Sequence, residues 1–314
     1  MDYNPIKMNK ILNKKWIINS DLAKIFEVEV KAPQIAKKAH AGNFIIIRLH
    51  EGGERVPLTI ADYNREKGTI TIVTQVMGKS THLFSELETG DYILDLFGPL
   101  GNNIELKQYN GVVVMIGGGV GIAPVYPQCK ELKKVGNEII CILGARTKDL
   151  LFWEDKFRSI ADEVIITTDD GSAGKKGFVT QALQELMNSK NIAHVIAIGP
   201  LIMMKFVADM TRSDSQKGKP DIPTDVSLNT IMVDGTGMCG GCRFPTLDGK
   251  IKYSCVDGPD VDGHNVNFEV LLARNNRFSE LEERSNEGFI KERDPETCKL
   301  LQGIKDLKNK KKLI

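Results

Sequence analysis

The first hundred residues alternate short apolar runs with turn residues. The runs are rich in Ile and Val, they are separated by Gly, Pro and Asn, and they cover residues 15–18, 25–30, 43–49, 69–76 and 91–97. Several short strands at such close spacing are typical of a β-barrel. We therefore expect an antiparallel β-barrel domain over residues 1–108, interrupted at 54–59 and by a short helix at 82–88.

From about Gly111 the pattern changes to apolar strands that alternate with helix-like segments. The expected strands are 112–116, 139–143, 164–168 and 194–198, and the expected helices are 125–135, a segment from about 151, and 181–189. This alternation predicts a parallel, doubly wound α/β sheet, here placed at 109–222. A glycine-bearing turn follows each strand, at the carboxyl ends where such sheets bind ligands. Met203 and Met204 follow the last turn and are expected to pack in the core.

A third segment begins after the polar stretch 213–220, which has the composition of a linker. We expect a strand at 226–233 and a small β segment over 223–270. The remaining residues, 271–314, are highly charged and end in a basic stretch at 308–312. They predict either an extended arm that is solvated or covers a partner, or a surface helix followed by a disordered end.

The third segment carries the most specific chemical signal of the chain. Asp234-Gly-Thr-Gly-Met-Cys239-Gly-Gly-Cys242, followed by Cys255, places one carboxylate and three thiols at spacings of four, two and twelve residues. The plant-type [2Fe–2S] pattern is C-x4-C-x2-C…C, so this is that pattern with Asp234 in place of the first cysteine. The glycines allow a short loop to fold round a cluster. We predict Asp234, Cys239, Cys242 and Cys255 as cluster ligands.

Other interpretations of these cysteines remain open. Cys239-x-x-Cys242 alone could be a thioredoxin-like pair, although no βαβ pattern lies nearby. The four side chains could hold structural zinc, although zinc ribbons favour two C-x2-C knuckles. The thiols could also be inert core residues. The spacing favours the iron–sulfur cluster over all three.

Composition excludes several functional classes. The 314 residues suffice for two or three domains, and 42 Lys and Arg against 41 Asp and Glu give a net charge of +1. Nucleic acid and anionic lipid are therefore not expected partners. Six unevenly placed cysteines suit a reducing cytosol better than a disulfide scaffold. The polar start and the lack of an 18-residue apolar run predict a cytoplasmic protein with no signal peptide and no membrane span.

Two glycine-bearing turns could cradle phosphate. Gly78-Lys79-Ser80-Thr81 opens the first expected helix, where free N–H groups attract anions, although an ordinary helix cap explains it as well. The turn after the first parallel strand would let a pyrophosphate approach the backbone, although a tight turn with no ligand is the alternative. Its residues are Gly117, Gly118, Gly119, Val120, Gly121, Ile122, Ala123 and Pro124.

These motifs, in this order, resemble a known superfamily. A barrel with Arg55-Val-Pro57-Leu58-Thr59, a nucleotide domain with the turn at 117–124 and a cysteine-rich segment are similar to ferredoxin–NADP reductases. Over about residues 12–270 the chain resembles the electron-transfer subunits of dihydroorotate dehydrogenase B. With Asp234 it resembles more closely the small (alpha) subunits of NADH-dependent reduced ferredoxin:NADP oxidoreductases, also called sulfide dehydrogenase or ferredoxin–NADP reductase subunit alpha.

The resemblance implies FAD in the barrel, NAD(H) in the α/β domain and one [2Fe–2S] cluster with an Asp ligand. Pro57, Leu58 and Thr59 match the flavin motif, with Thr59 beside the isoalloxazine N5 and Leu58 replacing a stacking tyrosine. Arg55 is one position from the family arginine that holds the FAD pyrophosphate. The remaining matches are Gly78, Lys79, Ser80 and Thr81 at a second phosphate contact, the 117–124 turn at the dinucleotide, and Gly199 and Pro200 near the nicotinamide.

Two further features bear on the nucleotide. Ile198 stands where many relatives have cysteine, so no thiol should assist hydride transfer, and no catalytic acid, base or nucleophile is expected. Gly144, Arg146 and Lys148 follow the second strand, where a 2′-phosphate would be read. The two cations could favour NADP, but related NAD-using subunits also carry an arginine there, which favours NAD.

The resemblance also implies a partner. A single cluster needs an acceptor, and Cys129, Cys141 and Cys298 are too scattered to build a second one. In the resembled family the partner is a larger glutamate-synthase-like flavoprotein that handles ferredoxin, and the pair couples NADH, NADPH and ferredoxin by flavin-based bifurcation. The alternatives are an electron-transfer subunit of dihydroorotate dehydrogenase, whose pattern has four cysteines, and a zinc-stapled, non-redox binding module.

Overall fold

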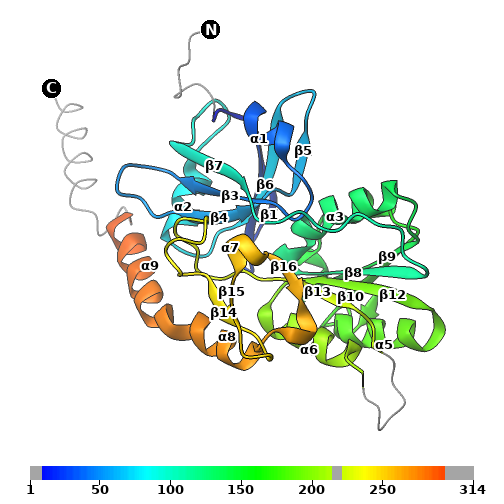
Figure 1. Ribbon diagram of the computed structural model, residues 1–314. Helices are drawn as coiled ribbons and strands as arrows, with labels where there is room; N and C mark the ends of the chain where they lie inside the picture. The colour runs from blue at the N-terminus through cyan, green and yellow to red at the C-terminus, as the bar shows by residue number, and fades with distance from the viewer. Residues whose placement is uncertain (1–8, 214–220, 294–314) are drawn as a thin grey trace, which may run out of the picture.

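The computed structural model describes residues 9–213 and 221–293. Most of the expected linker, Cys298 and the basic stretch at 308–312 lie outside these residues. Figure 1 shows the barrel above the α/β sheet, with the segment that contains the cysteines against both of them. Within the described ranges, no helix has the length and apolar character needed to cross a membrane.

The N-terminal domain is an antiparallel barrel made of two sheets, with strand orders β1-β2-β6-β5 and β4-β3-β7. Its core consists of inward-facing residues such as Phe26, Val28, Ile45 and Ile72. The elements are β1 (Ile11–Asn19), β2 (Lys24–Lys31), α1 (Pro33–Lys38), β3 (Phe44–Arg48), β4 (Val56–Thr59), β5 (Asp62–Asn64), β6 (Thr69–Gln75), α2 (Lys79–Glu86) and β7 (Asp95–Leu100). The predicted barrel is confirmed.

Two details of the barrel differ from expectation. The stretch at 54–59 does not interrupt the barrel, because Val56–Thr59 forms β4 and pairs with β3. The last strand begins at Asp95 rather than 91, because its pairing with β3 starts there, while Tyr92 makes only an isolated bridge to Lys10. Pairing with a distant strand thus sets both boundaries, and the local sequence does not contain that information.

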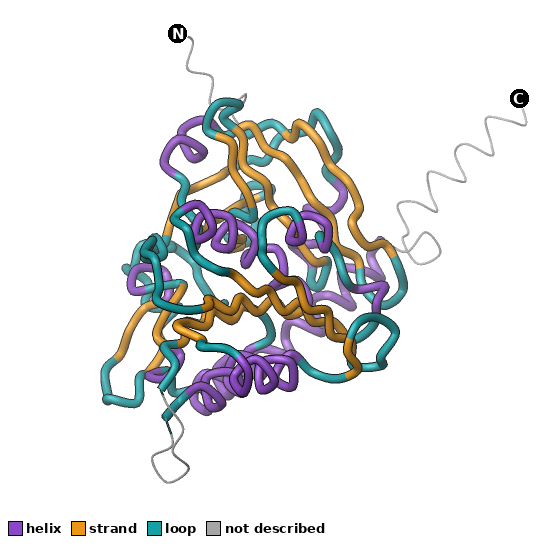
Figure 2. Tube along the Cα trace, turned by 90° about the vertical axis from the view of Figure 1, so that its right-hand side faces the viewer, coloured by secondary structure: helices purple, strands orange, loops and turns teal. Residues whose placement is uncertain are grey.

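The α/β domain is built on a seven-stranded sheet with the order β11-β10-β9-β8-β12-β13-β16. Its strands are β8 (Val112–Gly118), β9 (Ile139–Ala145), β10 (Glu163–Thr168), β11 (Lys175–Lys176), β12 (Ile192–Ile198), β13 (Thr224–Ser227) and β16 (Asp260–Asp262). The helices are α3 (Ile122–Lys134), α4 (Glu154–Arg158), α5 (Val179–Ser189) and α6 (Leu201–Thr211). The strands pair in parallel except β16, and Figure 2 shows helices on both faces. The doubly wound fold is confirmed, although the helix expected from 151 begins at Glu154.

The strand order reverses between β8 and β12. From β8 the chain runs outward to β9 and β10, then returns to place β12 on the other side of β8. The connection after β8 leads to β9 on one side, and the connection after β12 leads to β13 on the other side. Because these neighbouring connections diverge, a crevice opens at the carboxyl ends of β8 and β12. The glycine turns at 117–121 and 199–200 are the turns that follow these two strands.

The third segment is less independent than the sequence indicates. Its strands β13 and β16 extend the nucleotide sheet, while β14 (Arg243–Pro245) and β15 (Ile251–Tyr253) form a separate hairpin. The helices are α7 (Ser254–Asp257), α8 (Phe268–Asn275) and α9 (Ser279–Arg293). The strand expected at 226–233 is wrong beyond Ser227, and the charged end is helical as far as Arg293 rather than extended.

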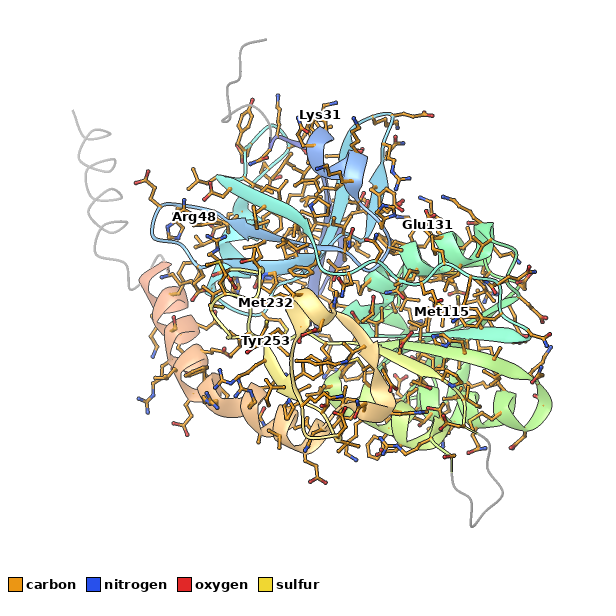
Figure 3. The ribbon with its side chains drawn as sticks, in the orientation of Figure 1. Lys31, Arg48, Met115, Glu131, Met232 and Tyr253 are labelled. Atoms are coloured by element: carbon orange, nitrogen blue, oxygen red, sulfur yellow. The ribbon has the colours of Figure 1, made fainter. Side chains whose placement is uncertain are left out.

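Shared apolar cores join the three units. Ile18, Ile25 and Val73 of the barrel lie in one cluster with residues of β8, β9 and α3. Phe44 and Ile46 of β3 pack with Met232 and two cysteines of the third segment. In Figure 3, Met232 and Tyr253 lie where the third segment meets the barrel. The barrel therefore packs directly against both of the other units.

Candidate functional site

The loop between β13 and β14 is shaped by glycine. Gly235, Gly237 and Gly240 all have positive φ angles, between 66° and 85°, which residues with a Cβ rarely adopt. A Cβ added at Gly235 would lie 2.7 Å from side-chain carbons of both Ile46 and Leu100. The loop therefore rests directly on strands β3 and β7 of the barrel, and its glycines permit that contact.

The four predicted ligands come together as two pairs. Sγ of Cys242 lies 3.2 Å from Sγ of Cys255, and Sγ of Cys239 lies 3.0 Å from Oδ1 of Asp234. Cys242 and Cys255 are buried, whereas Cys239 is exposed. The loop and α7, which contains Cys255, thus form an inner pair of thiols, and the loop alone supplies an outer pair made of a thiol and a carboxylate.

This pairing fits two irons better than one zinc ion. Over residues 9–213 and 221–293, no group of three or more His, Cys, Asp or Glu side chains is placed to hold a single metal ion. A structural zinc site needs four ligands round one ion. A [2Fe–2S] cluster instead takes two protein ligands on each iron, which is the arrangement of the two pairs. The donor set therefore fits the predicted cluster.

Neighbouring groups hold Asp234 in its ionised form. Its carboxylate accepts hydrogen bonds from the Cys239 thiol at 3.0 Å, the Thr236 hydroxyl at 2.7 Å and the Met238 N–H at 2.8 Å. Together these donors hold the pKa of Asp234 well below its usual value. In the inner pair, burial and the adjacent Cys242 thiol raise the pKa of Cys255. Bound iron would offset that cost by stabilising both thiolates.

The predicted FAD elements also lie together. Ser80, in the first turn of α2, donates a hydrogen bond to the carboxylate of Glu54, just before β4. The Thr81 hydroxyl accepts from the N–H groups of Met77 and Gly78, at 2.9 and 3.0 Å, and so ties the N-cap residue Gly78 to the first turn of the helix. A Cβ added at Gly78 would meet no atom within 4 Å. The start of α2 is therefore open, and its first N–H groups have no intrahelical acceptor.

Strand β4 supplies the other half of this site. Thr59 and Leu58 pair with Phe44 and Ile45 of β3, and Pro57 pairs with Ile46. All three β4 residues are half-buried, while Arg55 is exposed just ahead of the strand. Thr59, Arg55 and the α2 start thus lie along one connected wall, linked by the Glu54–Ser80 hydrogen bond. No pattern in the sequence singled out Glu54.

At the nucleotide turn, the first two glycines belong to β8 and the turn itself is Gly119–Gly121. A Cβ at Gly121 would lie 2.3 Å from the carbonyl oxygen of Ile198 and 2.7 Å from Cα of Gly199. The two glycine turns at the switch point are therefore in contact. A Cβ at Gly119 would meet nothing within 4 Å, so this position faces open space.

Met203 contributes to the same crevice. A Cβ at Gly118 would lie 2.4 Å from its Sδ, and one at Gly199 would lie 2.7 Å from its Cε. Met204 is buried in the core, as expected, but Met203 is half-buried against both glycine turns. Sequence reasoning missed this difference, because two adjacent methionines look alike until the helix face is known.

The remaining predicted nucleotide residues lie in two places, at the two glycine turns and at the end of β9. Ala123 is buried and Pro124 lies in the first turn of α3, while Val120 and Pro200 border the crevice. A Cβ at Gly144 would lie 2.3 Å from Val179 of α5, so the missing side chain permits close helix packing. Arg146 and Lys148 follow β9 and are exposed. They are free to approach a ribose but are not held in place by an ion pair within the described residues.

Comparison with known proteins agrees with this geometry. Residues 229–267 match the family described as the iron–sulfur cluster binding domain of dihydroorotate dehydrogenase B, and residues 115–209 match the oxidoreductase NAD-binding domain. The chain is 47% identical over 284 residues to an electron transfer subunit homolog of dihydroorotate dehydrogenase B (NAD(+)) from Thermotoga maritima, which covers 90% of this chain and 96% of that relative. It is 32% identical to the electron transfer subunit of Desulforamulus reducens, over 83% of this chain and all of the relative.

The chain belongs to the family of dihydroorotate dehydrogenase B electron-transfer subunits and their homologues. A solved structure of NADH-dependent reduced ferredoxin–NADP oxidoreductase, described as giving insights into flavin-based electron bifurcation, is 44% identical with a TM-score of 0.81. The match covers 93% of this chain and the whole of the chain in that structure. A cytochrome P450 reductase of Amycolatopsis, at 20% identity and a TM-score of 0.56, supports the reductase fold alone.

These findings confirm the resemblance and the fold class. The protein is an oxidoreductase subunit that transfers electrons and has an iron–sulfur binding domain and an NAD-binding domain. FAD, a [2Fe–2S] cluster and NAD(H) are the cofactors that this family membership supports. Its relatives are named as subunits, so a catalytic partner is implied.

Proposed function

We propose that this subunit exchanges a hydride with NAD(H) at FAD and delivers single electrons through a [2Fe–2S] cluster to a larger flavoprotein subunit. The complex would be an electron-bifurcating NADH-dependent ferredoxin:NADP oxidoreductase, of which this chain is the alpha subunit. Bound FAD would supply the conversion between two-electron and one-electron transfer. The chain's residues supply binding, orientation and the exclusion of water.

The arrangement of the ligand atoms in two pairs carries the proposal. Asp234 with Cys239 and Cys242 with Cys255 would each hold one iron. The inner pair packs against Phe44 and Ile46 of β3, and Phe44 pairs directly with Thr59 of the proposed flavin wall. One strand of the barrel thus separates the two redox sites, and the exposed Cys239 opens toward solvent and a partner.

The nucleotide would enter at the switch point between β8 and β12. Gly119 and the start of α3 would receive the pyrophosphate, and Gly199, Pro200 and Met203 would border the nicotinamide. Contacts between β6 and the Gly119–Gly121 turn set this crevice against the barrel. Arg146 and Lys148 would lie near the ribose. We propose NAD(H) as the nucleotide, in line with the relatives named for NAD(+).

The test uses the full chain purified without oxygen. We expect stoichiometric iron, sulfide and FAD, and bleaching of both the flavin and the iron–sulfur absorption by NADH, with a weaker response to NADPH. A colourless protein that contains zinc and no iron would overturn the redox function. Preferential reduction by NADPH would overturn only the choice of nucleotide.

The main alternative is service to a dihydroorotate dehydrogenase. Curated relatives that carry the subunit name are 30–32% identical to this chain, and one named as a homolog of that subunit is 47% identical. The solved ferredoxin–NADP oxidoreductase is 44% identical over all of its own chain. The polypeptide that co-purifies with this chain decides between them. A complex that oxidises dihydroorotate with NAD(+) would favour the alternative, whereas one that reduces ferredoxin with NADPH and NAD(+) would favour our proposal.

A further inference from the structure

A hollow of about 210 Å³ lies directly beside the loop between β13 and β14, residues 228–242, which we call the cluster loop. One side is formed by the loop and the start of β14, and the other by the end of α8 and the turn that follows it. Its apolar lining residues are Ile231, Leu271 and Phe278, of which Leu271 is buried. Gly241 also lines it, so the hollow shares a wall with the Cys239–Cys242 segment.

Three guanidinium groups border this hollow. Arg243, Arg274 and Arg277 all line it, and Arg243 and Arg277 are exposed while Arg274 is half-buried. Within the described residues, no carboxylate forms an ion pair with any of them. Arg243 has one partner, the carbonyl oxygen of Gly240 at 3.0 Å. The lining of the hollow, as far as the structure describes it, thus holds three cations and no acidic side chain, in a chain that is almost neutral overall.

Burial and mutual repulsion disfavour the three charges, although Arg243 donates a hydrogen bond to the carbonyl oxygen of Gly240 and the Arg277 guanidinium lies 5.9 Å from the centroid of the Phe278 ring. Burial, and then the charges of Arg243 and Arg277, lower the pKa of Arg274. Like charges that share a partly apolar hollow repel one another, and desolvation weakens their hydration. A bound anionic group would remove the net repulsion and offset the desolvation by direct ion pairing. The three arginines of the hollow therefore favour the binding of an anionic group.

The cluster loop and the hollow both carry exposed apolar side chains. Met238 is 88% exposed and Ile231 is 44% exposed, both on the cluster loop, and Phe278 is 41% exposed at the edge of the hollow. An apolar centre with arginines at its border is the composition of a protein-binding surface.

We propose that Arg243, Arg274 and Arg277 bind an acidic segment of the redox partner and so dock that partner over the cluster loop. This inference rests on the proposed function, which requires a partner that takes electrons from this loop. Opposite charge at the border steers encounter and fixes register, while Met238, Ile231 and Phe278 exclude water at the contact. The partner's acceptor is thereby held next to Cys239, the exposed ligand.

The test compares complexes of the full chain with the partner subunit that co-purifies with it. We expect the double variant Arg274→Glu and Arg277→Glu to raise the dissociation constant of the complex by about tenfold or more at low salt. Because opposite charges would no longer attract, the affinity of the variant should also depend less on salt concentration than that of the wild type. NADH-dependent reduction of ferricyanide by the isolated subunit should not change.

A matched control reverses two exposed lysines far from the hollow, Lys37→Glu and Lys190→Glu. We expect this variant, which has the same net charge, to bind the partner as the wild type does. Arg274→Gln with Arg277→Gln should give an intermediate loss and guards against misfolding. An unchanged dissociation constant and salt dependence in the glutamate variant, or an equal loss in the lysine control, would overturn the docking surface. Neither result would affect the iron, flavin and NADH measurements on which the proposed function depends.

Discussion

At the scale of single residues, Asp234 is the position at which this chain departs from an all-cysteine cluster. Its carboxylate is already oriented by Thr236, Met238 and Cys239 before any metal is considered. Such a hydrogen-bonded oxygen ligand forms a more ionic bond to iron than a thiolate does. The identity of this ligand should therefore tune the cluster rather than decide whether it forms.

We predict that Asp234→Cys keeps two irons per chain but shifts the midpoint potential, whereas Asp234→Ala loses most of the iron. Thr236→Val removes only a supporting hydrogen bond and should weaken iron binding by about 10-fold to 100-fold. Iron analysis and a redox titration followed by EPR measure these changes. An unaltered midpoint and EPR signal in Asp234→Cys would show that Asp234 is not a ligand.

Gly121 tests the contact between the two nucleotide turns. A Cβ there would lie 2.3 Å from the carbonyl oxygen of Ile198, so Gly121→Ala must separate the ends of β8 and β12. We expect a loss of about 1–3 kcal/mol in the free energy of unfolding, together with a raised KM for NADH. Gly288→Ala is the control, because its Cβ would meet nothing within 4 Å. Unchanged stability and KM in Gly121→Ala would refute the close contact.

At the scale of elements, α9 lies against the start of α2, which is the proposed FAD pyrophosphate site. Nδ2 of Asn286 donates to the carbonyl oxygen of Met77 at 3.5 Å, and the ring of Phe289 lies 6.1 Å from that of His82 and 6.0 Å from Nζ of Lys79. The sequence indicated either an arm or a surface helix here. The contacts indicate that the helix supports the FAD site.

We predict that Asn286→Ala with Phe289→Ala weakens FAD binding by about tenfold, roughly 1.4 kcal/mol, because α2 and Lys79 lose their outer support. The measurement is the release of fluorescent flavin on dilution. The control is Leu281→Ala with Ser285→Ala, two exposed positions on the same helix. Equal flavin retention in both variants would contradict a role for the inner face of α9.

At the scale of the whole molecule, Asp260 lies where the three units meet. It belongs to β16, accepts a hydrogen bond from Nε2 of Gln128 on α3 at 2.9 Å, and would lie 2.7 Å from a Cβ at Gly42 of the barrel. Oδ1 of Asp260 and Oε1 of Gln128 are both buried without a hydrogen-bond partner. Burial, with a smaller contribution from Asp225, raises the pKa of Asp260 to about 6.

The raised pKa predicts how stability depends on pH. The folded state keeps the proton on Asp260 after the unfolded state has lost it. The free energy of unfolding is therefore unaffected by Asp260 below about pH 4, decreases as the pH rises from about 4 to 6, and stays at the lower value above that. We expect Asp260→Asn to remove this slope and to stabilise the protein at pH 7 by at most about 3 kcal/mol. Chemical denaturation at several pH values measures it, with the exposed Asp21→Asn as control. A variant with the slope of the wild type would contradict this prediction.

Prediction from sequence succeeded where the physics is local. The spacing of Asp234, Cys239, Cys242 and Cys255 is set by what a short loop can enclose, and the structure brings these four side chains together in two pairs. Alternating strands and helices likewise require a parallel sheet with its turns at one edge. It failed at β4 and at residues 228–233, because these depend on which distant strand or turn lies alongside.

The sequence by itself determined the barrel, the doubly wound sheet and the type of chemistry, since periodicity and ligand spacing are properties of the chain as written. Tertiary structure alone decided that β13 and β16 extend the nucleotide sheet and that α9 braces α2. It also decided that Arg243 meets Arg274 and Arg277 beside the cluster loop. Those contacts join residues far apart in the chain, and only the packing of shared apolar cores determines which of them meet.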